Sequence, residues 1–235
     1  MNDCFILSMM KTTQKWCTGN VKLMLENSYN WTMHNAAHRG YIEIVKLMLG
    51  RGANNYNESM NSAATNGYIE IVKLMLEKGA NNYHATMNSA ARSGYIDIVK
   101  LMIEKGVNNY NWAMIGAANN GHIDIVKLML EKGANDYDEA MRFAAYKGHT
   151  HIVELMLEKG ANNYNETMMH AAAGGHIDIV KLMLEKGANY YKDAIICAKN
   201  QKHMDIVNLL NVCSLIRKED TEYSYTLKWR EMEYD

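Results

Sequence analysis

The sequence predicts an all-α solenoid of stacked helix-turn-helix units, and three observations support this fold class. Glycines recur every 27 residues, at Gly40, Gly67, Gly94, Gly121, Gly148 and Gly175. After each glycine a phrase close to I-E-I-V-K-L-M-L-E returns, with its apolar residues at helical spacing. Proline is absent, although turns must separate the helices. A fixed period of this size is typical of repeat proteins, in which each unit buries its core against its neighbours.

The glycines set a register in which each glycine is position 1. Six full repeats then span residues 40–201, and Lys202 takes the next glycine position. Residues 1–39 form an N-terminal cap and a short degenerate repeat, in which the segment 21–39 lacks three loop residues. Residues 202–216 form a capping half repeat, and 217–235 form a polar tail. We expect the apolar segment FILSMM (5–10) to cover the first repeat, and YSYTLKW to form a short strand or helix.

The first helix of each repeat is predicted at positions 3 to 11. Its charged positions 4, 7 and 11 share one narrow arc and every other direction is apolar, so we expect neighbouring copies to cover it on several sides. Acid and base pairs at a spacing of three line the arc: Glu43/Lys46, Glu70/Lys73, Asp97/Lys100, Asp124/Lys127 and Asp178/Lys181. This arc is interpreted as a solvated face and not as catalytic carboxylates.

A second, shorter helix is predicted at positions 19 to 27, with a buried stripe of Met at 21 and Ala at 24 and 25. Position 18 offers side chains that commonly cap a helix N-terminus: Asn57, Asn111, Asp138 and Asn165. Position 13 is glycine in every full repeat and is expected to end the first helix: Gly52, Gly79, Gly106, Gly133, Gly160 and Gly187.

The repeated phrase resembles the ankyrin repeat. The residues that carry the resemblance are GHIDIVKLMLEKGAN at 121–135 and 175–189, preceded by M-x-x-A-A. An ankyrin unit usually has roughly 33 residues. The residues missing here fall where an ankyrin repeat projects a β-hairpin finger, so we expect a tight Asn-rich loop in its place. Short, Asn- and Tyr-rich units of this kind are similar to ankyrin proteins of giant amoeba-infecting DNA viruses (mimivirus-like).

Three residue columns follow the register. Methionine at positions 9 and 21 is interpreted as a core stripe. Tyrosine at position 17 is expected to pack on the next loop, and a stacking platform for bases is the alternative. Histidine at position 2 is expected to play a structural role, as in the G-H pair of ankyrin repeats. His149 and His151 form an H-x-H without a further ligand at a suitable spacing, so no metal site is predicted.

Composition argues against several functions. Net charge is −1 with a pI near 6.8, which offers no basic surface for nucleic acid. The four cysteines show no pairing pattern, which favours a reducing compartment such as the cytoplasm. If the protein is viral, this compartment is the cytoplasm of the host cell. We expect no signal peptide and no membrane contact, because the apolar run from Cys4 to Leu7 is too short and follows Asp3 instead of a positive cluster. We expect no cofactor and no catalytic residue, because no nucleophile motif or phosphate-binding glycine loop is present.

A binding surface is predicted where the repeats differ most. Positions 19, 22, 23 and 26 share the outward face of the second helix, expected to be concave, and are small or polar in the early repeats. In the middle repeats they become large or cationic, at Trp112, Ile115, Arg142, Phe143, Tyr146, Met169 and His170. Such residues anchor protein interfaces. For Phe143 and His170, burial between helices is the alternative.

The leading functional hypothesis is a non-enzymatic, monomeric module that docks a protein partner, of host or viral origin. The alternatives are a structural solenoid that associates with itself and an adaptor that recruits a ubiquitin ligase.

Overall fold

The computed structural model describes residues 24 and 26–215, and every regular element among these residues is a helix. The expectations for FILSMM and for the tail at 217–235 concern residues outside this range. Two compact units are distinguished, which meet in sequence between Asn108 and Asn109. No helix within the described residues is both long and apolar enough to cross a membrane.

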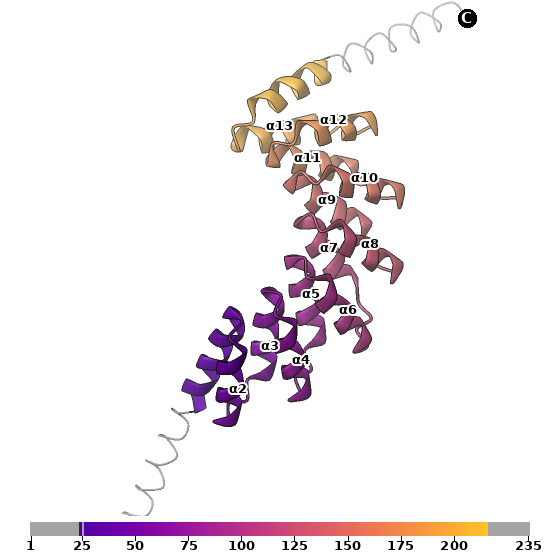
Figure 1. Ribbon diagram of the computed structural model, residues 1–235. Helices are drawn as coiled ribbons and strands as arrows, with labels where there is room; N and C mark the ends of the chain where they lie inside the picture. Colours follow the sequence, from indigo (N-terminus) through magenta and orange to yellow (C-terminus); the bar gives the residue numbers. More distant parts are fainter. Residues whose placement is uncertain (1–23, 25, 216–235) are drawn as a thin grey trace, which may run out of the picture. The chain divides into compact units, whose positions relative to one another are not determined.

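The first unit begins with a helix over residues 26–39. It continues with α2 (Ile42–Gly50), α3 (Tyr56–Thr65), α4 (Ile69–Glu77), α5 (Tyr83–Ser93) and α6 (Ile96–Glu104). The helix α3 packs against both α4 and α5, and α4 lies between α2 and α6 (Figure 1). Successive repeats are therefore stacked side by side.

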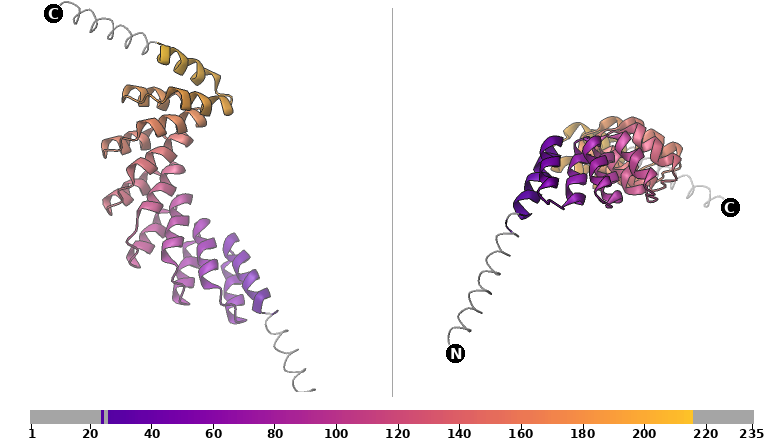
Figure 2. Two further views of the ribbon diagram at one scale, coloured as in Figure 1. Left: turned by 180° about the vertical axis from the view of Figure 1, so that it is seen from behind. Right: turned by 60° about the horizontal axis from the view of Figure 1, so that its bottom comes forward.

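The second unit has the same organisation over more repeats. It contains α7 (Asn111–Asn119), α8 (Ile123–Glu131), α9 (Tyr137–Lys147), α10 (Thr150–Glu158), α11 (Tyr164–Gly174), α12 (Ile177–Glu185) and α13 (Tyr191–Asn200), followed by a helix over 204–215. The helices α7, α9, α11 and α13 form one layer, and α8, α10 and α12 form the other (Figure 1 and Figure 2). The all-α, ankyrin-type fold class predicted from the sequence is confirmed.

The lengths of the two helices correct one prediction. The first helix of each repeat covers positions 3 to 11, as expected. The second begins at the tyrosine of position 17 in most repeats, two residues earlier than predicted, and α5, α9 and α11 reach eleven residues against nine for α4. The second helix is therefore the longer one in most repeats, because the tyrosine at position 17 and the predicted N-cap residue at position 18 already belong to it; α7, which begins at Asn111, has nine residues.

The core consists of the residues at the interfaces between repeats. Methionines at position 21 are fully buried in every described repeat that has them, and those at position 9 are buried from Met48 to Met183. The paired alanines at 24 and 25 are buried as well. Small alanines let the second helices approach closely, and flexible methionines fill the remaining gaps. The predicted core stripe is confirmed except at Met24, which is exposed.

The first helix is less covered than predicted. In α4 the residues Ile71, Val72 and Met75 are buried, whereas Ile69, Leu74 and Leu76 are only half-buried. Neighbouring repeats cover one broad side, and the remaining leucines lie at the edge of the charged arc. On that arc three of the predicted ion pairs form, Lys46–Glu43 at 2.8 Å, Lys73–Glu70 at 3.0 Å and Lys181–Asp178 at 3.9 Å.

The side chains at position 18 do not cap their own helices, which corrects a second prediction. Because the helix begins at position 17, they lie inside its first turn and make no side-chain cap. Each instead accepts hydrogen bonds from the loop of the next repeat. The Oδ1 atom of Asn57 accepts from the backbone N–H of Asn81 at 2.8 Å and of Asn82 at 3.0 Å.

The same bond recurs along each unit. The acceptors are Asn30, Asn57, Asn111, Asp138 and Asn165, and the donors are the backbone amides 24 or 25 residues later. A backbone amide left unpaired in a loop costs free energy. These bonds pair the backbone N–H groups of the shortened loops and hold each loop to the preceding repeat. The repeats can therefore stack without hairpin fingers.

The glycine at position 1 is required by backbone conformation and by close contact. Gly148 has φ +81°, and a Cβ atom placed on it would lie 2.5 Å from the ring of His176 in the next repeat. The ring of Tyr68 crowds Gly40 in the same way. Lys202 adopts a φ of 65° and is the one non-glycine residue with positive φ in the described range. Here the side chain is tolerated at the expense of backbone strain.

Replacing Asn57 with alanine is expected to lower the free energy of unfolding by about 1 to 3 kcal/mol, because two loop amides lose their acceptor. Urea unfolding followed by circular dichroism measures the change. Asn57→Asp is the matched control, because Asp138 fills the equivalent place with a carboxylate. Equal midpoints for the alanine variant and the wild type would contradict the structural role of this bond.

Lys202→Gly is expected to stabilise the C-terminal end by roughly 1 kcal/mol, since glycine adopts positive φ without strain. Gly148→Ala is expected to destabilise the second unit by more than this, because strain and contact with His176 add together. Thermal unfolding monitored by circular dichroism compares the two. A Lys202→Gly variant with a lower melting temperature than the wild type would show that contacts of the lysine side chain stabilise the fold by more than the backbone strain destabilises it.

Candidate functional site

The predicted binding residues lie on three neighbouring second helices of the second unit. We call them the partner face: Trp112 and Ile115 on α7, Arg142, Phe143 and Tyr146 on α9, and Met169 and His170 on α11. The helix α9 packs against both α7 and α11, so the fold brings these residues onto consecutive helices. None of them belongs to the buried Met and Ala stripe. The scaffold does not require their side chains.

Trp112 is the most exposed residue of the partner face, with 67% of its surface accessible. It lies in the first turn of α7, next to Ala113 and Met114, which are fully buried. An indole held by a rigid helix loses little conformational freedom when it binds. Ile115 is half-buried one turn further along.

Arg142 is not a free cation. Its guanidinium group bonds Oε2 of Glu139 through Nε at 3.1 Å and through a second nitrogen, and lies 5.1 Å from the ring centre of Phe143. These contacts fix the guanidinium as a flat, charge-balanced cover over a half-buried phenylalanine. The surface of α9 is therefore more apolar than its sequence indicates.

Tyr146 carries an exposed ring on a backbone that the next repeat holds in place. The ring is 42% exposed, and Nζ of Lys147 lies 5.5 Å from its centre. The carbonyl oxygen of Tyr146 accepts a hydrogen bond from Nε2 of His176 at 3.1 Å. Gly174 lies so close to this carbonyl that it has no room for a side chain. A structural histidine thus helps to position a candidate binding residue.

Met169 and His170 on α11 are half-buried. Nδ1 of His170 donates to the carbonyl oxygen of Glu166 at 2.9 Å, one turn earlier in the same helix. The sequence left open whether His170 and Phe143 are exposed or buried between helices. Both residues are half-buried in the structure, so neither alternative holds fully.

Two exposed apolar residues on second helices were not predicted as binding residues from the sequence. Ile196 on α13 occupies position 22, like Ile115 and Met169, and is exposed. It continues the row of the partner face onto the next helix, since α13 packs on α11. Trp31 occupies position 19, like Trp112, and is also exposed. The shared triplet Y-N-W at 29–31 and 110–112 was the signal that could have found it.

The histidine and cysteine side chains that could bind a metal or act as a nucleophile make contacts within the fold. Nε2 of His149 lies 3.3 Å from the carbonyl oxygen of Asn119, and Nδ1 of His151 lies 3.4 Å from Glu154. Within the described residues, no three His, Cys, Asp or Glu side chains gather as a metal site would require. Burial, together with Asp193, raises the pKa of the Cys197 thiol, which makes it a poor nucleophile at neutral pH.

The tyrosines at position 17 are half-buried in every described repeat. In α3, α5, α9, α11 and α13 this tyrosine is the first residue of the second helix, while the bonds that hold the next loop come from position 18. Whether their rings pack on that loop, as the sequence predicts, stays a prediction.

Comparisons with known proteins agree with this architecture. The family model for ankyrin repeats (3 copies) matches residues 12–86, 33–113, 61–140 and 113–194. These overlapping matches span most of the sequence, and the chain belongs to the ankyrin-repeat family. Ankyrin repeats generally mediate protein–protein interactions and are typically non-enzymatic. Nothing in the comparisons indicates catalytic activity in this chain.

Among solved structures, the chain is similar to the crystal structure of the human ASB11 ankyrin repeat domain. The sequences are 22% identical, the match covers 67% of this chain and 84% of that chain, and the TM-score is 0.54. This likeness concerns the fold. No curated protein matches the sequence.

A variant that retains Trp112 as its only tryptophan is expected to be quenched by acrylamide nearly as readily as a free tryptophan analogue, because the indole is mostly exposed. Trp16, Trp31 and Trp229 are replaced with phenylalanine to make it. Stern–Volmer plots give the comparison. Strong protection from quenching in the isolated protein would mean that the indole is already covered and unavailable to a partner.

Proposed function

We propose that this chain is a non-enzymatic binding module that docks a protein partner on the partner face of α7, α9 and α11. One observation carries the proposal: large aromatic and aliphatic side chains stand on a rigid helical surface whose packing does not need them. Exposed apolar residues that cluster on one face mark interaction sites in soluble proteins. The general role of ankyrin repeats in protein interaction supports the same conclusion.

The chemistry of the partner face favours an apolar patch on the partner, with a polar rim. Trp112, Ile115 and Met169 offer hydrophobic area, and the Arg142–Glu139 pair adds little net charge. Aromatic anchors surrounded by half-buried residues are the usual arrangement of interface hot spots. A strongly charged partner surface would find no matching charge here.

The resemblance to giant-virus ankyrin proteins makes a protein of the host cytoplasm the first partner to test. The free thiols Cys197 and Cys213 are compatible with a reducing compartment. The adaptor alternative depended on the C-terminal residues 217–235, which lie outside the described residues, and no described feature favours it. Self-association has a specific observation in its favour at the other end of the chain, taken up below.

Substituting Trp112, Arg142 and Tyr146 together with alanine is expected to weaken partner binding by at least about tenfold, because hot-spot residues typically contribute 2 kcal/mol or more each. A photo-reactive amino acid placed at Ile115 identifies the bound protein, and titration calorimetry with that purified protein measures the affinity. Helical content and thermal midpoint should change little, because none of the three belongs to the buried core.

The matched control replaces three exposed charged residues of the first-helix layer with alanine: Lys127, Glu131 and Glu154. It should bind the partner as tightly as the wild type. Equal loss of affinity in both triple variants would place the binding site elsewhere on the solenoid.

A further inference from the structure

We propose that two copies of this chain form a dimer by exchanging N-terminal arms. The arm is defined as residues 18–26, TGNVKLMLE, which correspond to positions 3 to 11 of a repeat. In this dimer the arm of one copy occupies the place beside α2 of the other copy that a preceding first helix fills beside α4, α6, α10 and α12. The proposal concerns the opposite end of the sequence from the partner face and does not depend on it.

The side of α2 that would face a preceding repeat is open within the described structure. Ile44 at position 5 is 41% exposed, whereas its counterpart Ile71 in α4 is 2% exposed. Leu47 at position 8 is 53% exposed, while Leu74 is half-buried. The difference arises because α4 lies against α2, and α2 has no equivalent neighbour among the described helices. An apolar strip is left at this end of the first unit.

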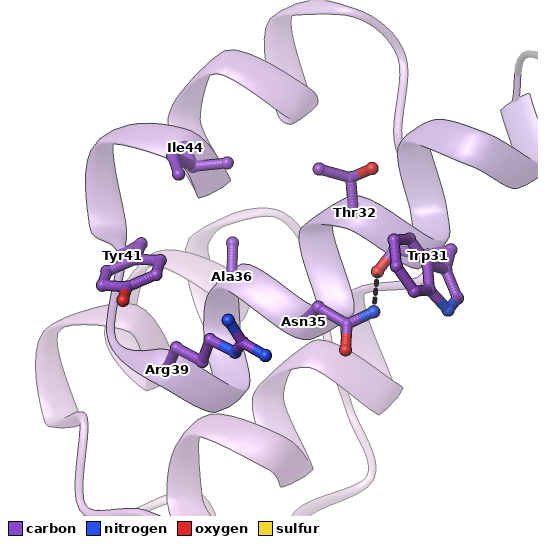
Figure 3. Close-up of a pocket in the computed structure, with 7 residues that line it drawn as sticks. All are labelled: Trp31, Thr32, Asn35, Ala36, Arg39, Tyr41 and Ile44. Carbon is purple, nitrogen blue, oxygen red and sulfur yellow. Dashed lines mark hydrogen bonds between the residues drawn. The ribbon is translucent and has the colours of Figure 1, made fainter.

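A groove of about 310 Å³ follows this strip. Its lining comes from the helix over 26–39 and from the start of α2, namely Trp31, Thr32, Asn35, Ala36, Arg39, Tyr41 and Ile44. Figure 3 shows Tyr41 and Trp31 toward opposite ends, with Ala36 between them and Ile44 above Ala36 on the neighbouring helix. Asn35 bonds the carbonyl oxygen of Trp31 at 2.8 Å, so its amide is already used within the helix. The groove is predominantly apolar and suits the apolar side of a helix.

The arm carries the sequence that fills this place elsewhere. Its segment VKLMLE at 21–26 recurs at 72–77, 126–131 and 180–185, in the first helices α4, α8 and α12. The methionine of this phrase is fully buried in those three helices, at Met75, Met129 and Met183. Met24 is instead 73% exposed. The ankyrin family match begins at residue 12, which includes the arm in a repeat.

The described end of the arm, Met24 and Glu26, cannot lie beside α2 of its own copy without a break in the helix. In a full repeat the segment from Lys78 to Asn82 links the two helices, and Gly79 reverses the chain with φ +99°. Only Asn27 and Ser28 stand in the corresponding place, and no glycine is present. Residues 26–39 accordingly form one uninterrupted helix, and Met24 is helical as well. Met24 and Glu26, the two arm residues that the structure describes, therefore belong to the helix region that forms one wall of the groove.

A connection too short to fold back, together with an unfilled place for the same element, is the condition under which domains exchange. A second copy supplies an identical arm, and twofold symmetry lets each arm cover Ile44 and Leu47 of the other copy. The proposed dimer departs from the monomer that the sequence analysis predicts.

Sedimentation velocity of the full chain is expected to show a dimer. Ile44→Asp should raise the dissociation constant at least tenfold, because it places a charge in the apolar strip of both grooves. Ile196→Asp is the matched control, since it introduces the same charge at an exposed isoleucine of α13 and should leave the dimer intact. A wild-type chain that remains monomeric at tens of micromolar would overturn the proposal.

Restoring the missing loop separates arm exchange from any other dimer. Replacing Asn27 and Ser28 with Lys-Gly-Ala-Asn-Asn, the sequence found at 78–82 and 159–163, should let the arm cover its own groove and yield a folded monomer. Circular dichroism checks that helical content is retained. A variant that stays dimeric would show that the copies associate by another surface.

Cross-linking of the unaltered chain gives a test that does not depend on any variant. Heavy-isotope and ordinary chains are refolded together and treated with a lysine cross-linker, which is expected to join Lys22 of one copy to Lys46 on α2 of the other. Mixed heavy and light peptide pairs support exchange. Pairs of a single isotope only would place the arm on its own copy and overturn the proposal.

Discussion

The packing of each repeat against the next, through columns of methionine and alanine, is the constraint on which the rest of the structure depends. A single helix pair of this size cannot bury enough apolar surface to be stable alone, so stability exists only between copies. This requirement keeps the first helix and the Met/Ala stripe nearly constant along the chain. It also explains the crowded glycines, since Gly148 leaves room for the His176 ring that joins one repeat to the next.

The backbone amides of the shortened loops need hydrogen-bond acceptors, and the side chains at position 18 provide them. A full ankyrin finger satisfies its own backbone groups by pairing its two strands. When the finger is removed, the loop amides need acceptors, and the neighbouring repeat provides them through residues such as Asn57 and Asp138. The Asn-rich character of the sequence is therefore a consequence of the short repeat and not a sign of a polar binding surface.

Packing between repeats leaves two kinds of surface available for function. The outward face of the second helices is free to vary, and in the second unit it carries Trp112 and Tyr146 on backbones that the core and the next repeat hold rigid. The end of the stack at α2 is different, because its apolar residues are those of an ordinary repeat interface. Ile44 and Leu47 are exposed at this end because no preceding first helix covers them among the described residues; the same residue types are covered in later repeats.

Much of the fold was predictable from the sequence, because a period repeated many times averages out local ambiguity. The positions of the first helices, the core methionines from Met33 to Met183 and the glycine turns were predicted correctly. The errors came at the boundaries: Tyr56 begins a helix that was expected to start later, and Asn57 serves the next loop and not its own helix. Hydrogen bonds between residues some 24 positions apart leave no local pattern from which they could be recognised.

The candidate site divides in the same way. The sequence by itself determined which positions vary, since comparison of the repeats with one another identifies the face that packing does not constrain. Only the tertiary structure decided that Arg142 is paired with Glu139, that Phe143 is half-covered, and that Trp31 borders a groove. The physical reason is that burial and pairing belong to neighbours in space, and in a solenoid the neighbours of a residue lie a whole repeat away along the chain.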